Sequence, residues 1–129
     1  MSAIEAIRVV DDVLVMVLGG VRGQAEAECG FAAFKARLDR SGVRNVLFDT
    51  RLAKNADKPE QLMMRARTFG AATPPCRVAI LARALDGEFA RIYRRALADT
   101  GHEAQIFTEV SEARAWLSTQ VEADSLYLA

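Results

Sequence analysis

The chain has 129 residues, of which 51% are hydrophobic, so it can bury one core of ordinary size, and we expect a single domain over residues 1–129. Its 17 basic and 17 acidic residues balance, which argues against a strongly basic nucleic-acid surface or a polybasic membrane patch. Arginine supplies 14 of the 17 bases, and because its guanidinium pairs with carboxylates in a forked geometry, we expect local ion pairs.

Targeting and redox features are absent from the sequence pattern. No basic flank leads into an apolar run with a small-residue cleavage site, and the longest apolar run, Val13 to Leu18, is too short to cross a membrane. Cys29 and Cys76 lie far apart and match no metal or redox spacing. We therefore expect a cytoplasmic protein with two reduced, buried thiols, no metal, no cofactor and no membrane insertion.

The chain opens with two predicted strands. Residues 13–18 are β-branched and apolar on both of their alternating faces, which is typical of a strand covered on both sides, and residues 4–10 are predicted to form another strand. Asp11 and Asp12 between them are typical of a tight turn. The two strands should therefore form an antiparallel hairpin.

A helix is predicted over residues 24–40, because its apolar residues form one stripe. They are Ala27, Phe31, Phe34 and Leu38. Gly42 suits the C-terminal end of this helix. The glycines before it lack the spacing of a dinucleotide or P-loop fingerprint, so we expect them only to turn the chain from strand to helix. They are Gly19, Gly20 and Gly23.

Two further strand–helix units follow. A strand is predicted over 45–49, and then a helix with Asp57 as N-cap, Pro59 in the first turn and Glu60 completing a capping box. The inner face of this helix is Leu62, Ala66 and Phe69, and the helix ends at Thr73, Pro74 and Pro75.

The last half of the chain continues the alternation of strands and helices. Residues 77–82 form a buried strand, Asp86 caps the next helix, and Gly101 ends it. The inner face of that helix is Phe89, Ile92, Tyr93, Ala96 and Leu97. A short strand over 105–107 leads to a final helix from Thr108, with Val110, Ala113 and Leu117 facing inward. The tail VEADSLYLA either packs or frays.

These elements predict an α/β fold with one five-stranded mixed sheet and four helices. Only the first hairpin should be antiparallel, and right-handed crossovers make the remaining pairs parallel. If the strands join in order, the helices gather on one face, yet the strands are apolar on both. The second face must be covered by a bent-back helix, the tail, a second subunit or an apolar ligand.

The acidic residues in VVDD and VLFD are similar to the carboxylate cluster of a response-regulator receiver domain, which holds a magnesium ion. In that arrangement a helix would follow Asp12, but Val13 starts a strand. A hydroxyl after RVAILA and a lysine after the last strand are also expected, and Arg83 and Thr108 stand there instead. The receiver interpretation is therefore the weaker one.

The phrases NVLFDTR, CRVAILA and QIFTEVSEARAWL, in this order over residues 11–117, resemble the SpoIIAA-like proteins, relatives of the STAS domain. The resemblance implies a βα superhelix with progressively ordered strands. In the anti-sigma-antagonist branch, a phosphorylatable serine follows an Asp at the start of the helix after the third strand. The matching positions here are Lys58 and Pro59, and no serine lies between Asn45 and Pro75. The resemblance thus implies the fold without an evident phosphoacceptor serine.

The segment Asp49–Thr50–Arg51 is the first candidate binding site, because it follows a buried strand at the carboxyl end of a predicted parallel sheet. Asp49 and Arg51 point the same way on an extended chain, so they form either a structural ion pair or the rim of a site. Thr50 is the only hydroxyl near this strand end.

Arg91 and Arg95 are the second candidate site, since with Arg94 they place positive charge on the outer face of the third helix. The face is either solvated or a docking surface for an acidic partner. His102 lies in a helix-to-strand turn, and we expect it to be solvated there. Met63 and Trp116 should belong to the core, while Met64 lies off the apolar stripe.

No acid pair, metal cluster or nucleophile–base set indicates an enzyme. We expect a non-catalytic regulatory or protein-interaction domain, either a homodimer or bound to another protein through apolar surface that the helices leave open. The alternative is a carrier or sensor of a small apolar, lipid-like ligand held in a cavity lined by Met, Phe and Leu side chains.

Overall fold

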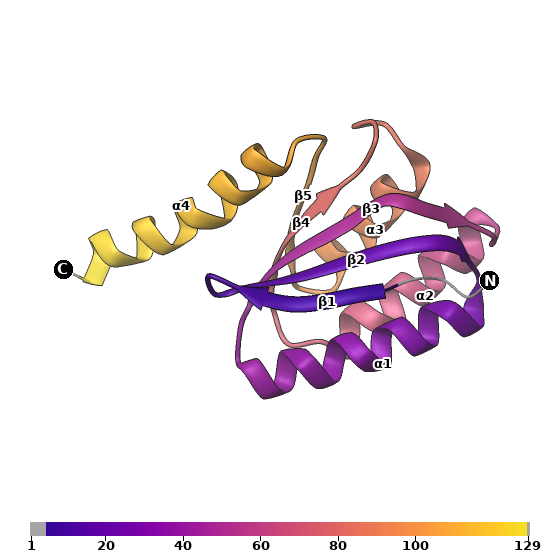
Figure 1. Ribbon diagram of the computed structural model, residues 1–129, viewed down its shortest axis with the longest axis horizontal. Coiled ribbons are helices and arrows are strands. Elements are labelled where there is room, and N and C mark those ends of the chain that lie inside the picture. The colour runs from indigo at the N-terminus through magenta and orange to yellow at the C-terminus, as the bar shows by residue number, and fades with distance from the viewer. Residues whose placement is uncertain (1–4, 129) are drawn as a thin grey trace.

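The computed structural model describes the backbone of residues 5–128 and the side chains of residues 6–119. Five strands form one mixed sheet in the order β1-β2-β3-β4-β5, with β1 antiparallel to β2 and the other pairs parallel (Figure 1). The strands are β1 (Glu5–Val10), β2 (Val13–Arg22), β3 (Asn45–Asn55), β4 (Arg77–Leu81) and β5 (Glu103–Phe107). The helices are α1 (Gln24–Ser41), α2 (Pro59–Ala71), α3 (Glu88–Asp99) and α4 (Val110–Leu128). The predicted fold class is confirmed; Ile4, where the first strand was predicted to begin, lies outside the described residues.

The turn between β1 and β2 shows why the chain forms a hairpin after Val10. Asp11 and Asp12 both adopt positive φ, 50° and 62°, and Val10 pairs directly with Val13. A two-residue loop with positive φ at both positions matches the right-handed twist of the flanking strands. The strand that follows the acidic pair excludes the receiver arrangement, in which a helix would begin there.

Strands β2 and β3 are longer than predicted. Gly19 and Gly20 were expected to turn the chain, but β2 continues through them to Arg22 and pairs with β3 as far as Asn55. A register shift between Val17 and Gly19, with Gly20 at φ 70°, keeps the two strands paired. Because β4 ends at Leu81, opposite Asp49 on β3, the β2–β3 ribbon extends beyond the rest of the sheet and carries Arg22 up to the start of α1.

The starts of three helices differ from the prediction: α2 and α3 by one residue, and α4, which begins at Val110 rather than at Thr108, by two. The N-cap of α2 is Lys58, not Asp57, and its N–H donates to Gln61 Oε1 at 3.1 Å. The N-cap of α3 is Gly87, not Asp86. Asp57 therefore does not cap α2, and its carboxylate instead pairs with the buried Arg65. Gly42 ends α1 as predicted, at φ 72°.

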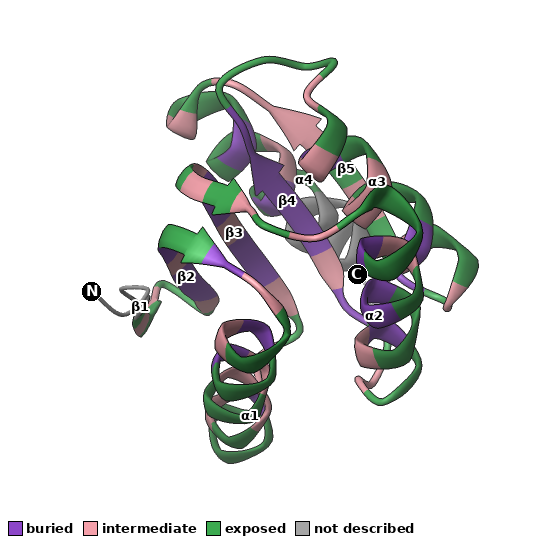
Figure 2. Ribbon diagram, turned by 90° about the vertical axis from the view of Figure 1, so that its right-hand side faces the viewer, coloured by how far each residue is buried: buried purple, intermediate pink, exposed green. Residues whose placement is uncertain are grey.

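Helices α1, α2 and α3 pack on one face of the sheet, and the first turns of α4 pack on the other, over β3, β4 and β5 (Figures 1 and 2). The core on the three-helix side includes Leu14, Met16, Leu38, Val46, Val78 and Ile80. The core on the α4 side consists of Val15, Leu47, Ala79, Leu81, Ala113 and Leu117. Of the four possibilities for the second face, the helix is the one that the structure shows. The inward residues predicted for α4 are thereby confirmed.

Helix α4 is held to the sheet by a contact between Arg77 and Trp116. The Arg77 guanidinium lies over the indole, 3.9 Å from the ring centroid, and Nη1 donates to the Trp116 carbonyl. Phe107 packs against the same indole, with ring centroids 5.5 Å apart. The helical backbone continues to Leu128, but the side chains of residues 120–129, which include the tail, lie outside the described residues. Within the described residues no helix is long and apolar enough to cross a membrane.

Candidate functional site

A cavity of about 80 Å³ lies between the sheet and helices α1, α2 and α3; we call it the helix-side cavity. Its walls are mostly apolar, because the inward stripes of the three helices and of β2–β4 converge there. The apolar lining includes Met16, Leu18, Ala27, Phe31, Phe34, Val46, Phe48, Ala66, Phe69, Val78, Phe89, Tyr93 and Leu97. An apolar cavity with a few polar groups at its edge is the usual form of a small-molecule site.

Aromatic rings supply much of this wall. Phe31 on α1 stacks on Phe69 of α2, with ring centroids 4.2 Å apart and planes inclined by 4°. Tyr93 on α3 contacts Phe48 and Phe89, with centroid distances of 5.2 Å and 5.0 Å. The ribbons of α1 and α2 stand apart in Figure 2, so the Phe31–Phe69 stack is a side-chain bridge between them. Both rings are partly exposed, and both line the cavity.

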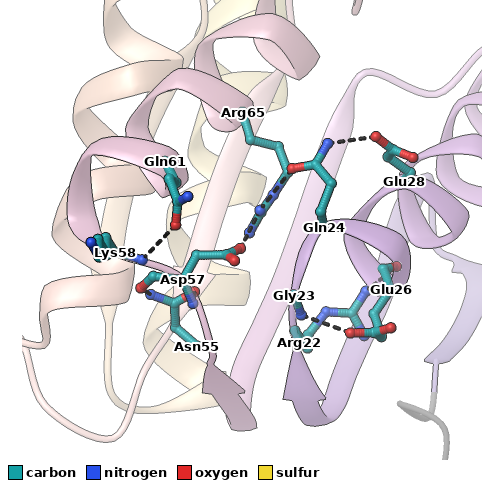
Figure 3. A network of polar contacts seen from close by, with 10 residues as sticks. All are labelled: Arg22, Gly23, Gln24, Glu26, Glu28, Asn55, Asp57, Lys58, Gln61 and Arg65. Atoms are coloured by element: carbon teal, nitrogen blue, oxygen red, sulfur yellow. Dashed lines mark hydrogen bonds and ion pairs between the residues drawn. The ribbon is translucent and has the colours of Figure 1, made fainter.

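Two buried arginines line one end of the cavity, which we call the arginine end. Arg22 is 3% exposed and Arg65 is 5% exposed. Arg65 Nη1 forms an ion pair with Asp57 and donates to Gln24 Oε1 at 3.3 Å. Figure 3 shows this network where the first turns of α1 and α2 meet the ends of β2 and β3. Arg22 Nη2 donates to the Glu26 carbonyl at 3.0 Å, which ties the end of β2 to the first turn of α1.

The carboxylates at this end lie farther out than the guanidinium groups. The Asp57 side chain is 17% exposed, against 4% for that of Arg65, and Glu26 is half-buried. Glu26 also accepts the Gly23 N–H at 2.8 Å. Burial raises the pKa of the Tyr93 hydroxyl, while the charge of Arg65, a hydrogen bond with Arg65 and the charge of Arg22 act in the opposite direction. The two buried guanidinium groups and the Tyr93 hydroxyl are thus neighbouring polar groups in the lining of the cavity.

His102 lies at the far end of the cavity and is buried, at 6% exposure, so the expectation of a solvated histidine is wrong. Its Nδ1 accepts the Cys76 N–H at 3.1 Å, and its Nε2 donates to the Gly70 carbonyl at 2.8 Å. These two bonds assign the neutral tautomer with the proton on Nε2. The ring joins the end of α2 to the start of β4, which is a structural role.

None of the three residues of the predicted site, Asp49, Thr50 and Arg51, lines the helix-side cavity. Arg51 donates to both Asp49 oxygens, Nε to Oδ1 at 3.0 Å and Nη2 to Oδ2 at 2.8 Å. The Thr50 hydroxyl donates to the Leu81 carbonyl at 2.7 Å. Burial raises the pKa of the Asp49 carboxyl, but hydrogen bonds from the Arg51 side chain and backbone outweigh it and hold that pKa below its ordinary value. The contacts tie strand ends together, and a binding role for this segment stays a prediction.

The predicted site at Arg91 and Arg95 lies on the exposed surface of α3, beside an open groove between α2, α3 and β5. Arg94 and Glu88 line the same groove, together with the apolar side chains of Met63, Leu85, Ile92 and Ile106. Asp99 pairs with Arg67 of α2 at 2.9 Å rather than with this group. The groove is separate from the helix-side cavity.

The two cysteines differ from each other. Cys76 is buried as expected, and burial raises the pKa of its thiol. Cys29 is exposed on α1, so the expectation of two buried thiols is wrong for it. Among the described residues, no group of three or more His, Cys, Asp or Glu side chains is placed to hold a metal ion.

Comparison with known proteins establishes what fold these elements make. A solved structure of an uncharacterised DUF3478-family protein from Shewanella loihica PV-4, which has a SpoIIAA-like fold, superposes with a TM-score of 0.60 over 90% of this chain and 93% of its own. This chain has the SpoIIAA-like fold. The two sequences are 18% identical, so the likeness extends to the fold alone. No family model matches the chain, and no curated protein matches it.

The SpoIIAA-like fold places at the arginine end two residues that the sequence prediction did not identify, Arg22 and Arg65. A signal for Arg65 was present, because it lies three residues after Leu62 and one before Ala66, on the inward stripe of α2. A charged residue on an apolar stripe is rarely buried without partners and indicates a polar site. Arg22 carried no comparable signal, since β2 was predicted to end before it.

Proposed function

We propose that this SpoIIAA-like domain is a non-catalytic carrier or sensor that binds a small apolar molecule in the helix-side cavity. The single observation that supports this best is the cavity itself, with apolar walls from three helices and the sheet and a small set of polar groups at one end. Burying a hydrocarbon group there stabilises the complex by about 0.8 kcal/mol per CH₂.

The volume of the cavity limits the size of the ligand. Its 80 Å³ is about half of the ~150 Å³ engineered apolar cavity that binds benzene. A short hydrocarbon chain is therefore the largest group that enters without movement. A longer ligand requires the lining side chains to move, and the partly exposed rings of Phe31 and Phe69 are the part of the wall that we expect to move.

Native mass spectrometry of freshly purified protein tests this function, because it reports protein mass and bound ligand together. The informative variant is Ala66→Leu, in which a fully buried cavity-lining methyl is replaced by an isobutyl group that fills the space. The matched control is Ala33→Leu, the same change at an exposed position of α1.

We expect a bound small molecule on the wild-type protein and on Ala33→Leu, and none on Ala66→Leu. Added 1-hexanol should raise the melting temperature of the first two proteins only, because a ligand that binds the folded state stabilises it. A wild-type protein that carries no ligand and gains no stability from 1-hexanol would contradict the proposal.

A second candidate function is self-association, with a second copy of this chain docked in the groove between α2, α3 and β5. The observation that favours it is the combination of Arg91, Arg94 and Arg95 with the apolar side chains of Met63 and Ile92 beside the last strand of the sheet. Exposed arginines around an apolar patch are typical of protein interfaces.

Sedimentation velocity over a range of concentrations tests this second function in its homodimer form. A dimer formed through the groove should show a mass that rises with concentration, and Arg91→Glu with Arg95→Glu should abolish that rise. If the mass of the wild-type protein is that of a monomer throughout, self-association through the groove is wrong.

A further inference from the structure

One hydrogen-bond donor of Arg65, the Nε–H group, has no acceptor among the described residues. The residue is 95% buried, and its Nη1 contacts Asp57 and Gln24, yet its Nε has no hydrogen-bond partner among the described residues. A buried donor without an acceptor is unfavourable, and native proteins rarely leave one in place. Arg65 is one of the residues that line the helix-side cavity, so a ligand in the cavity lies next to its side chain.

At the arginine end, the positively charged groups lie deeper in the protein than the negatively charged ones. Arg22 and Arg65 are the most deeply buried charged groups there, whereas Asp57 and Glu26 lie closer to solvent. Solvent screens the outer carboxylates more strongly than it screens the inner guanidinium groups. A group at the end of the cavity therefore experiences donors and positive charge more than it experiences the carboxylates.

From these two observations we infer that the arginine end is a subsite for an anionic head group, and that the ligand is a small carboxylate with an unbranched apolar chain. The chain occupies the apolar part of the cavity, and a carboxylate oxygen accepts the hydrogen bond from Arg65 Nε. Arginine suits this role because its guanidinium pairs with carboxylates in a forked geometry. The inference rests on the proposed function, since it requires a ligand in the same cavity.

Three unbranched probes of six carbon atoms each differ in their head group: hexanoate, 1-hexanol and hexylamine, each titrated by calorimetry into wild-type protein. We expect hexanoate to bind roughly tenfold more tightly than 1-hexanol, because a hydrogen bond to a charged group is about twice as strong as a neutral one. Hexylamine should bind more weakly than 1-hexanol.

Two substitutions should change the preference for hexanoate over 1-hexanol in opposite directions. Arg65→Gln removes Nε–H and the charge, so hexanoate should lose its advantage over 1-hexanol. Asp57→Asn removes the acid that competes for Arg65, so the advantage should grow. Arg67→Gln is the matched control on an exposed face of α2, and it should leave the ratio unchanged. Asp57→Asn retains both buried arginines, so the subsite can be tested even if Arg65→Gln does not fold.

The outcomes distinguish the subsite from the function. If 1-hexanol binds and hexanoate binds no more tightly, Arg65 Nε is satisfied by a water molecule, so the subsite is wrong while the apolar function stands. If none of the three probes binds, both the proposed function and the anionic subsite are wrong. If hexanoate is preferred equally by wild-type protein, Arg65→Gln and Asp57→Asn, the anion binds elsewhere and the assignment to the arginine end is overturned.

Discussion

The rings of Phe31 and Phe69 stack face to face, 4.2 Å apart, and join two helices whose backbones stand apart over an apolar cavity. The stack is a stabilising contact, and both of its rings are partly exposed parts of the cavity wall. An aromatic pair contributes about 0.5–1.5 kcal/mol beyond the area that it buries, so thermal motion can open it at modest cost.

Replacing Phe31 with alanine should therefore make the cavity easier to enter. We expect Phe31→Ala to lower the free energy of unfolding by about 1–2 kcal/mol and to raise the association rate of 1-hexanol in stopped-flow fluorescence. Phe31→Leu keeps an apolar side chain without the ring and should show an intermediate rate. An unchanged association rate in both variants would show that ligands enter by another route.

The Asp49–Arg51 pair should act as a structural tie. Arg51→Ala removes hydrogen bonds to a carboxylate whose side chain is 11% exposed, so it should cost about 1 kcal/mol in urea unfolding. Arg83→Ala, the same change at an exposed loop position, should cost nothing measurable. If Arg51→Ala leaves stability unchanged but abolishes binding of a partner, the pair is part of a site.

The same pair predicts a dependence of stability on pH. The pKa of the Asp49 carboxyl is lower in the folded protein than its ordinary value of 3.8, so the folded state binds fewer protons there than the unfolded state. The contribution of Asp49 is therefore fully present above about pH 4, and it is lost as the pH falls through the folded pKa. Unfolding of wild-type protein and Asp49→Asn should give free energies that converge as the pH falls through this range; a difference that stays constant would contradict the assignment.

Trp116 should anchor α4 to the sheet. Trp116→Ala removes the surface against which Arg77 and Phe107 pack, and we expect a loss of about 2–3 kcal/mol because the indole is half-buried. Trp116→Phe keeps a ring and should recover much of that loss. Hydrogen exchange should rise first in the amides of α4, and protection that stays unchanged along this helix would refute the anchoring role.

His102 should be required for the junction between α2 and β4. His102→Ala leaves the Cys76 N–H and the Gly70 carbonyl without their partners, so it should cost about 2 kcal/mol or more. Thermal unfolding measures this cost, and the exposed substitution Gln105→Ala provides a control on β5. A variant as stable as wild type would mean that water replaces both hydrogen bonds.

The elements of the fold could be predicted because their apolar residues repeat with the period of a helix or a strand. Leu38 on α1 and Leu117 on α4 are examples, and both are fully buried as expected. The extension of β3 past Asp49 could not be predicted in this way, because TRLAKN is mostly polar and only its pairing with β2 makes it a strand. The N-cap of α2 was misplaced for a related reason, since Asp57 is used by Arg65 rather than by the backbone.

Less of the candidate site than of the fold could be predicted from the sequence. The pairing of Asp49 with Arg51 followed from a spacing of two on a strand. The cavity is different, because residues as distant in sequence as Leu18 and Tyr93 meet only when the helices pack on the sheet. His102 was misjudged because its partners belong to other elements of the chain.

Methyl NMR spectroscopy during a titration with 1-hexanol is the most direct test of ligand binding in the helix-side cavity. We expect saturable shifts in the methyl groups of Met16, Val46 and Ala66, which line the cavity, and little change at Ala79 and Ala113, which are equally buried in the core on the α4 side. Shifts confined to surface methyls, or no saturable shift at any concentration that leaves the protein folded, would contradict ligand binding in this cavity.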